Sequence, residues 1–170
     1  MTRARKDASA HDSTRPRTRA LLLAAGIAFV MAWPLAAQQG TPPPDFLITA
    51  KSSMEFDATV AKLKQAIEGE NLMVLHEIDP QQMLRMVGMR VGGMRQILFF
   101  HPRFMKQIVE TNPNGGIEPP LKLIVMERPD GTVMVRYENP EHQFGPYAGL
   151  EGLATELGGI FERVVGAVTG

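Results

Sequence analysis

Residues 121–137 read LKLIVMERPDGTVMVRY, and this stretch decides the fold. Two runs rich in aliphatic and β-branched residues, Leu121 to Glu127 and Thr132 to Tyr137, flank the turn Arg128-Pro129-Asp130-Gly131. An Asp-Gly pair between two such runs is a strong β-hairpin signal, because both residues tolerate the left-handed backbone that tight hairpin turns require. The sequence therefore predicts two adjacent antiparallel strands in the second half of the chain.

Upstream of this hairpin, the sequence predicts three strands and three helices in alternation. The strands are apolar runs bounded by turn residues, and they cover Phe46 to Ser52, Leu72 to Ile78 and Met94 to Phe100. The helices show apolar residues at the helical period, and they begin near Phe56, at Pro80 and after Pro102. On the second helix, Met83, Leu84 and Val87 form the expected apolar stripe, with Met86 beside them.

The remaining segments complete the predicted architecture. Asn112 to Gly116 and Pro140 to Gly149 are predicted to be loops, and Leu150 to Val168 a last helix. The order β-α-β-α-β-α-β-β-α predicts an α/β domain of the α+β kind with two layers, in which a mixed, mainly antiparallel sheet carries helices mostly on one face. Strict alternation would place Val74 and His76 on one face of the second strand and Met73, Leu75 and Glu77 on the other.

The beginning of the chain has the pattern of a secretory signal peptide. Three arginines between residues 15 and 19 precede an apolar run from Ala20 to Trp33, which Pro34 and Leu35-Ala36-Ala37 follow. A basic segment, a short apolar core and small residues at its exit are typical of such signals, and we expect cleavage after Ala37. The alternative is an uncleaved membrane anchor, although the run is shorter than the roughly 20 residues that a spanning helix needs.

This interpretation divides the chain into three parts. Residues 1–37 are the expected signal peptide, residues 38–45 a proline-rich leader, and residues 46–170 a single globular domain. The protein is then expected to be periplasmic or secreted, or membrane-anchored if the signal is not cleaved. The polar stretch before Arg15 is long for a signal peptide and leaves the true start codon open.

Composition excludes several classes of function. From Gln38 onward the chain carries 12 Lys and Arg against 16 Asp and Glu, so the mature domain is mildly acidic. It lacks the basic stripe of a nucleic-acid-binding protein, and its net charge does not favour anionic lipid. The chain has no cysteine, which excludes disulfides, iron–sulfur clusters, thiolate zinc sites and cysteine nucleophiles. No apolar run after Ala37 reaches the length of a membrane span.

Several segments resemble one known family. They are Thr59 to Ile67, His76 to Asp79, Leu98 to Pro102, Pro120 to Lys122, Asp130 to Val133 and Tyr137 to Pro140. In this order and spacing they are similar to the domain of unknown function 302 family, over roughly residues 46 to 168. The resemblance implies a compact α/β domain and a homodimer, and it supplies no reaction. One departure is Phe100, which stands where the family usually has a turn glycine.

The turn at His101 is the sharpest candidate site. His101 ends a strand just before Pro102 starts a helix, and a helix N-terminus with Arg103 beside it could hold an anion. His101 and Met105, four residues apart, could instead share a face and bind copper(I). The third possibility is a simple turn without a ligand. Tyr137, from the segment that resembles the family's closing hairpin, is a further candidate for contact with a ligand.

Asp79 is a second candidate for the ligand site. It precedes Pro80 in the N-cap position, where its carboxylate can satisfy free backbone amides, and this structural role is sufficient to explain it. Glu77 lies two residues earlier, and a pair of carboxylates can divide acid and base roles. No Gly-x-Ser-x-Gly motif and no phosphate-binding loop accompany them. An enzyme is therefore not the expectation.

The mature domain is rich in methionine. It has nine, and Met83 and Met86 lie three residues apart on a predicted helix. Thioethers are soft ligands, so Met83, Met86, Met105 and His101 are candidate copper(I) ligands, and the histidines are candidate axial ligands of a haem. The other interpretation is that these methionines fill a core that has few aromatic residues.

The sequence as a whole predicts an exported, non-catalytic binding or accessory domain, which forms a homodimer and binds a small molecule or an envelope protein. The alternative is a soft-metal or haem protein that uses methionine and histidine.

Overall fold

The structure, a computed structural model, describes residues 44–170. The expected signal peptide and most of the leader lie outside the described residues. The elements are β1 (Leu47–Lys51), α1 (Phe56–Gly69), β2 (Met73–Ile78), α2 (Pro80–Met86), β3 (Met94–Phe100), α3 (Pro102–Thr111), η2 (Pro113–Ile117), β4 (Leu121–Glu127), β5 (Val133–Glu138), α4 (Pro140–Phe144) and α5 (Glu151–Thr169). The predicted order of strands and long helices is confirmed.

The five strands form one sheet in the order β1-β5-β4-β3-β2. Every neighbouring pair is antiparallel, so the sheet is antiparallel throughout rather than mixed. The hairpin predicted for residues 121–137 forms β4 and β5, with Glu127 paired with Val133. Its turn uses Gly131 in the left-handed region at φ 78°, and the Thr132 amide donates to the Asp130 carboxylate at 2.9 Å.

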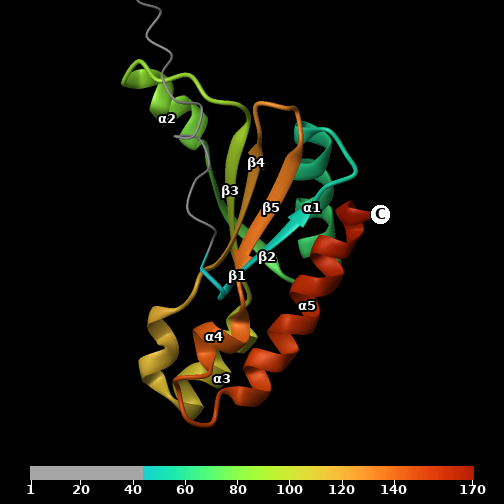
Figure 1. Cartoon of the computed structure of the whole chain (residues 1–170). Coiled ribbons are helices and arrows are strands. Elements are labelled where there is room, and N and C mark those ends of the chain that lie inside the picture. Colours follow the sequence, from blue (N-terminus) through green and yellow to red (C-terminus); the bar gives the residue numbers. More distant parts are fainter. Residues whose placement is uncertain (1–43) are drawn as a thin grey trace, which may run out of the picture. The chain divides into compact units, whose positions relative to one another are not determined.

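Helices cover one face of this sheet. Along β4, Leu121, Leu123 and Val125 are buried while Lys122 between them is exposed, which is the alternation of a strand with one covered face. The long helix α5 lies along the sheet and α1 lies beside α5 (Figure 1). Phe161 of α5 stacks on Tyr137 at 4.5 Å between ring centres and contacts Phe99 at 5.4 Å. Aromatic stacking therefore joins the helical layer to two strands.

Three local predictions were wrong. Residues 113–117 form a short 3-10 helix, and α4 begins at Pro140, where the sequence predicted loops. On β2 the register shifts between Val74 and His76, so Val74 pairs with Phe99 while His76 pairs with Leu98. Phe99 and Leu98 are adjacent in β3 and point to opposite faces. The bulge at Leu75 therefore places Val74 and His76 on opposite faces of the sheet, because one extra residue breaks the alternation.

Helices also mark the two ends of the sheet. α2 projects at one end, beyond β2 and β3, whereas α3 and α4 lie at the opposite end, beside the first turns of α5 (Figure 1). The candidate site residues of α2 and of α3 are consequently far apart.

Candidate functional site

The predicted site residues fall into three places, which are the start of α3, the region of α2 and, for Tyr137, strand β5. His101, Arg103 and Met105 lie at the start of α3, and Asp79, Met83 and Met86 lie on and before α2 at the other end of the sheet (Figure 1). The structure therefore separates the predicted metal ligands into two pairs, which do not form one site. Within residues 44–170 there is also no cluster of three or more histidine, aspartate or glutamate side chains that could hold a metal ion.

The predicted pair His101 and Met105 lies in one pocket of about 300 Å³. Its other walls are Met73, Leu75, Phe100 and Pro102. Met73 and Leu75 belong to β2, which is an edge strand of the sheet. Met73 pairs with Phe100 of the neighbouring strand β3. No local pattern in the sequence assigns Met73, Leu75 or Phe100 to this site, because their place in it depends on the pairing of β2 with β3. All walls except His101 are apolar side chains.

His101 has a structural role beside the pocket. Its Nδ1 atom accepts a hydrogen bond from the Arg103 backbone N–H at 3.1 Å, so His101 is the N-cap of α3. A neutral imidazole carries a proton on one nitrogen only, and an accepting Nδ1 leaves that proton on Nε2. In this state Nε2 can donate a hydrogen bond to a ligand but cannot bind a metal. A metal would have to displace the cap or compete for Nδ1.

Arg103 does not line this pocket. Its guanidinium lies over the Phe104 ring at 4.2 Å and forms an ion pair with Glu156 of α5 at 3.3 Å. The positive charge expected to hold an anion beside His101 is thus directed to a carboxylate on another helix. His101 and Arg103 are two residues apart in the sequence, but their side chains lie in different environments.

Tyr137 belongs to the core. Only 6% of its surface is exposed, and its ring is stacked on Phe161 with an interplanar angle of 8°. Burial raises the pKa of the Tyr137 hydroxyl, with a smaller contribution from the nearby charge of Glu162. Tyr137 is not among the residues that line the His101 pocket.

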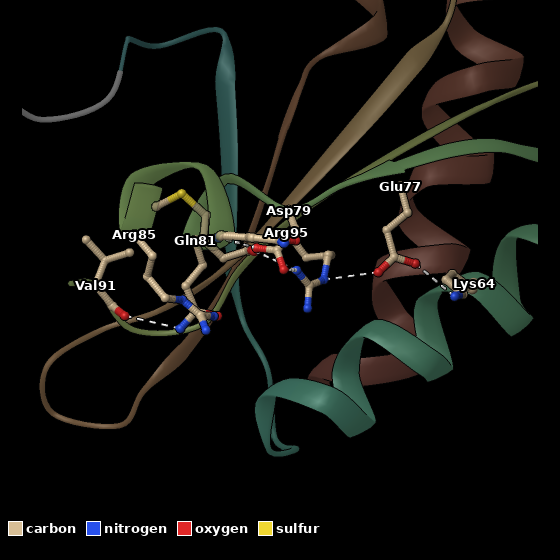
Figure 2. A network of polar contacts seen from close by, with 9 residues as sticks. Lys64, Glu77, Asp79, Gln81, Arg85, Val91 and Arg95 are labelled. Carbon is tan, nitrogen blue, oxygen red and sulfur yellow. Dashed lines mark hydrogen bonds and ion pairs between the residues drawn. The ribbon is translucent and has the colours of Figure 1, made fainter. Parts of the chain in front are cut away.

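A chain of charged side chains crosses the covered side of the sheet toward α2 (Figure 2). Glu77 pairs with Lys64 of α1 at 2.9 Å and with Arg95 of β3 at 3.0 Å. Arg95 also pairs with Asp79 at 2.5 Å, so one guanidinium joins the two carboxylates that sequence analysis considered as an acid–base pair. Both carboxylates are therefore already occupied by ion pairs within the domain.

Asp79 is the N-cap of α2, as predicted. Its carboxylate accepts a hydrogen bond from the Gln82 backbone N–H at 2.8 Å. This hydrogen bond and, to a smaller degree, Arg95 lower the pKa of Asp79. A lowered pKa keeps the group ionised, which is the opposite of what a general acid needs at neutral pH.

The methionines of α2 are outside the core. No residue of α2 is buried, and Met83, Met86, Val87 and Met89 are among the most exposed apolar side chains of the described residues. Of the predicted apolar stripe, Leu84 is partly buried, whereas Met83 and Val87 are not covered by any part of the chain that the structure describes. Met54 and Met73 are exposed as well, so core packing explains only part of the methionine set.

No helix within residues 44–170 has the combination of length and apolar character that a membrane span requires.

Comparison with known proteins places the fold. The family described as domain of unknown function DUF302 matches the chain over residues 48–168. A crystal structure of an uncharacterised conserved DUF302 protein from Bacillus stearothermophilus superimposes with a TM-score of 0.68 at 19% sequence identity, covering 74% of this chain and 99% of that one. No curated protein matches the chain.

Proposed function

The chain belongs to the DUF302 family, and we propose that it is a non-catalytic binding domain of the cell envelope whose ligand occupies the pocket at His101. The observation that carries this proposal is the pocket itself, which joins His101 and Met105 of the α3 start with Met73 and Leu75 of an edge strand. A concave apolar site with a single polar group is the usual form of a small-molecule site. The Nε2–H of His101 would orient a ligand that carries a hydrogen-bond acceptor.

A fluorescence titration tests this pocket. The probe is 8-anilinonaphthalene-1-sulfonate, which emits strongly in apolar sites. We expect saturable binding to the protein, and we expect Leu75→Lys or Met73→Lys to weaken it at least tenfold, because each half-exposed side chain stands in the wall of the pocket. Ile117→Lys is the matched control, since Ile117 is exposed on η2 and is not a wall residue. Equal binding by all four proteins would contradict the proposal.

Copper(I) is the second candidate ligand, and the pocket gives it one specific argument. Two thioethers, Met73 and Met105, line the same pocket as an imidazole. The capping role of His101 opposes it, because metal binding would cost the hydrogen bond from Arg103. Titration with copper(I) under reducing conditions separates the two ligands. Met105→Leu conserves volume, so it would keep the apolar probe and lose copper(I).

Export rests on the beginning of the sequence. The basic segment, the apolar run and Ala37 support a mature protein that begins at Gln38. Intact-mass measurement of protein from the cell envelope provides the test. We expect the mass of residues 38–170, and a species that retains residues 20–37 in the membrane fraction would replace cleavage by anchoring.

A homodimer is the proposed assembly. Its support is the small size of the domain, which has one five-stranded sheet, together with the exposed apolar side chains Met73 and Leu75 on the edge strand β2. Light scattering of the protein at 10–100 micromolar is the measurement. A mass equal to that of one chain across this range would rule the dimer out.

A further inference from the structure

The segment between β2 and β3 forms an arm that carries exposed apolar side chains. We define the α2 arm as residues 80–93. Within it, Met86 and Val87 are 83% and 79% exposed, and Met83 and Met89 are 60% and 53% exposed. Single exposed apolar residues are ordinary in proteins, but four within seven consecutive residues of one arm are a concentration that favours a binding surface.

The arm is cationic as well as apolar. Its only charged residues are Arg85 and Arg90, both exposed, and no acidic residue occurs between Pro80 and Val109. The domain as a whole is acidic, so this arm is a local exception to the net charge. The expectation that the protein has little attraction for anionic lipid, which rested on net charge, does not apply to this surface.

Hydrogen bonds within the arm organise its backbone at both ends of α2. Asp79 caps the start of α2, and Gly88, in the left-handed region at φ 81°, ends it. The Met89 N–H donates to the Leu84 carbonyl at 2.9 Å and the Gly88 N–H to the Arg85 carbonyl at 3.1 Å, which is a Schellman motif. The Gln81 side chain donates to the Val91 carbonyl at 3.2 Å and ties the helix to the returning chain (Figure 2).

The charges that face the arm come from its base. Asp79 and Glu127 lie there, Asp79 paired with Arg95 and Glu127 accepting from the Gly93 N–H at 2.9 Å. Arg85 is bonded to the neutral Gln81 at 2.8 Å, so it keeps its net positive charge at the surface. Asp79 at the base partly balances Arg85, and the arm as a whole combines the exposed side chains of Met86 and Val87 with the two cations Arg85 and Arg90.

We propose that the α2 arm docks the domain on the surface of an anionic lipid bilayer. Met86 and Val87 would enter the boundary between headgroups and acyl chains, while Arg85 and Arg90 contact the phosphates, which is how apolar and basic side chains share a membrane interface. Met83 and Met86 lie on the seven-residue helix α2, and Val87 and Met89 follow it, so the arm offers far fewer residues than the roughly 20–30 on each side of a standard protein interface. This proposal goes beyond the His101 pocket and does not depend on it.

Vesicle flotation is the first test, and it uses residues 38–170, the proposed mature form. This part is expected to fold alone, because the core lies within residues 48–168 and the solved relative consists of this domain over 99% of its chain. We expect binding to vesicles of equal phosphatidylglycerol and phosphatidylcholine, and little to phosphatidylcholine alone. Arg85→Gln with Arg90→Gln should lower the partition coefficient roughly 30-fold, from about 1 kcal/mol for each cation.

Two further variants separate the apolar contribution from general effects. Met86→Asp with Val87→Asp should abolish flotation, whereas Ile117→Asp should leave it unchanged, because Ile117 is equally exposed at 80% but lies on η2. Equal flotation of the arm variant and the wild type would overturn the proposal. Wild-type protein that binds neither kind of vesicle would overturn it as well. If, in that case, the arm variant also changes the mass measured by light scattering, the arm is instead a contact between two copies of the chain.

A fluorescence measurement locates the arm directly. The only tryptophan of the chain, Trp33, precedes Gln38, so the mature form has none. Val87→Trp then introduces a single reporter at the tip, and Ile117→Trp introduces the control. We expect the emission of the first to shift to shorter wavelength when anionic vesicles are added and that of the second to stay constant. Identical behaviour of the two reporters would contradict docking through the arm.

Discussion

At the scale of single residues, the structure assigns local structural roles to two of the predicted site residues. His101 and Asp79 each accept a backbone N–H at the start of a helix, at 3.1 and 2.8 Å. Such caps stabilise a helix because they satisfy amides that have no partner within it. For His101 this role fixes which ring nitrogen is free, and it thereby determines the kind of ligand that the adjacent pocket can hold.

Replacement of His101 separates capping from binding. His101→Ala should lower the free energy of unfolding by about 1 kcal/mol, because the Arg103 amide loses its partner. His101→Asn should retain most of that stability, since asparagine is a preferred N-cap, while it changes the polar group of the pocket. Urea unfolding measures both variants. A loss of stability in His101→Asn as large as in His101→Ala would show that the cap is not the source of the effect.

At the scale of elements, the contrast between α2 and α5 explains where stability is concentrated. α5 buries eight side chains against the sheet and its neighbours, whereas α2 buries none. Most helical stability in proteins comes from packing of an apolar face. α2 must therefore depend on its caps, on its Schellman motif and on the ion pairs of Arg95 with Asp79 and Glu77.

Two glycine replacements should act in opposite directions. Gly88→Ala places a Cβ at φ 81°, at a cost of roughly 1–2 kcal/mol from the left-handed backbone alone, because no other atom lies within 4 Å of the added carbon. Gly158→Ala, in the middle of α5 and equally free of neighbours, should gain roughly 0.5–1 kcal/mol. Hydrogen exchange of the Met89 amide reports the first and thermal unfolding the second. Changes of the same sign would refute this explanation.

The charge of Asp79 should contribute to stability in a pH-dependent way. Its pKa is lowered in the folded protein, chiefly by the Gln82 N–H and then by Arg95, so its contribution is present above the unfolded value of about 3.8 and is lost as the pH falls through the lower folded value. Asp79→Asn keeps a capping oxygen without the charge. We expect this variant to melt below the wild type at pH 7, and the gap to close below about pH 3.8. A gap that is independent of pH would exclude the charge as its cause.

At the scale of the whole molecule, one antiparallel sheet with helices on one face explains both the stability of the domain and its binding surfaces. The core side chains come from the sheet, from α1 and α5, and at one end from α3 and α4. The α3 helix, whose first residues line the His101 pocket, lies at one end of this framework, and α2 lies at the other (Figure 1). Ligand binding and membrane docking would therefore use different surfaces of one rigid domain.

The stability of this framework should be most sensitive to replacement of Phe161. Its ring contacts Phe99 and Tyr137, and only 1% of it is exposed. Phe161→Ala should cost about 3–5 kcal/mol, because it removes buried area and leaves a cavity. That is a large part of the 5–15 kcal/mol typical of a domain. Urea unfolding of this variant, with Phe161→Leu as a milder comparison, is the measurement. A loss below about 1 kcal/mol would show that the helical layer does not depend on this contact.

The sequence by itself determined the order of the strands and long helices, the hairpin of β4 and β5, and the position of the cap at Asp79. These features depend on neighbours a few residues apart, such as Asp130-Gly131 or Asp79-Pro80, so local patterns are sufficient to predict them. The family resemblance was confirmed by the match over residues 48–168. His101 and Met105, four residues apart, line the same pocket, and their role as a ligand site stays a prediction.

Tertiary structure alone decided which surfaces those elements present. Periodicity gave α2 an apolar stripe, but it could not show that Met83 and Val87 of this stripe stay exposed in the described part of the chain. The spacing of His101 and Arg103 suggested a shared site, yet Arg103 pairs with Glu156, 53 residues away. The bulge at Leu75 and the pairing of Met73 with Phe100 likewise arise between strands. Contacts between segments distant in sequence leave no local pattern, and for this reason the pocket walls and the exposed arm could be identified only in the folded domain.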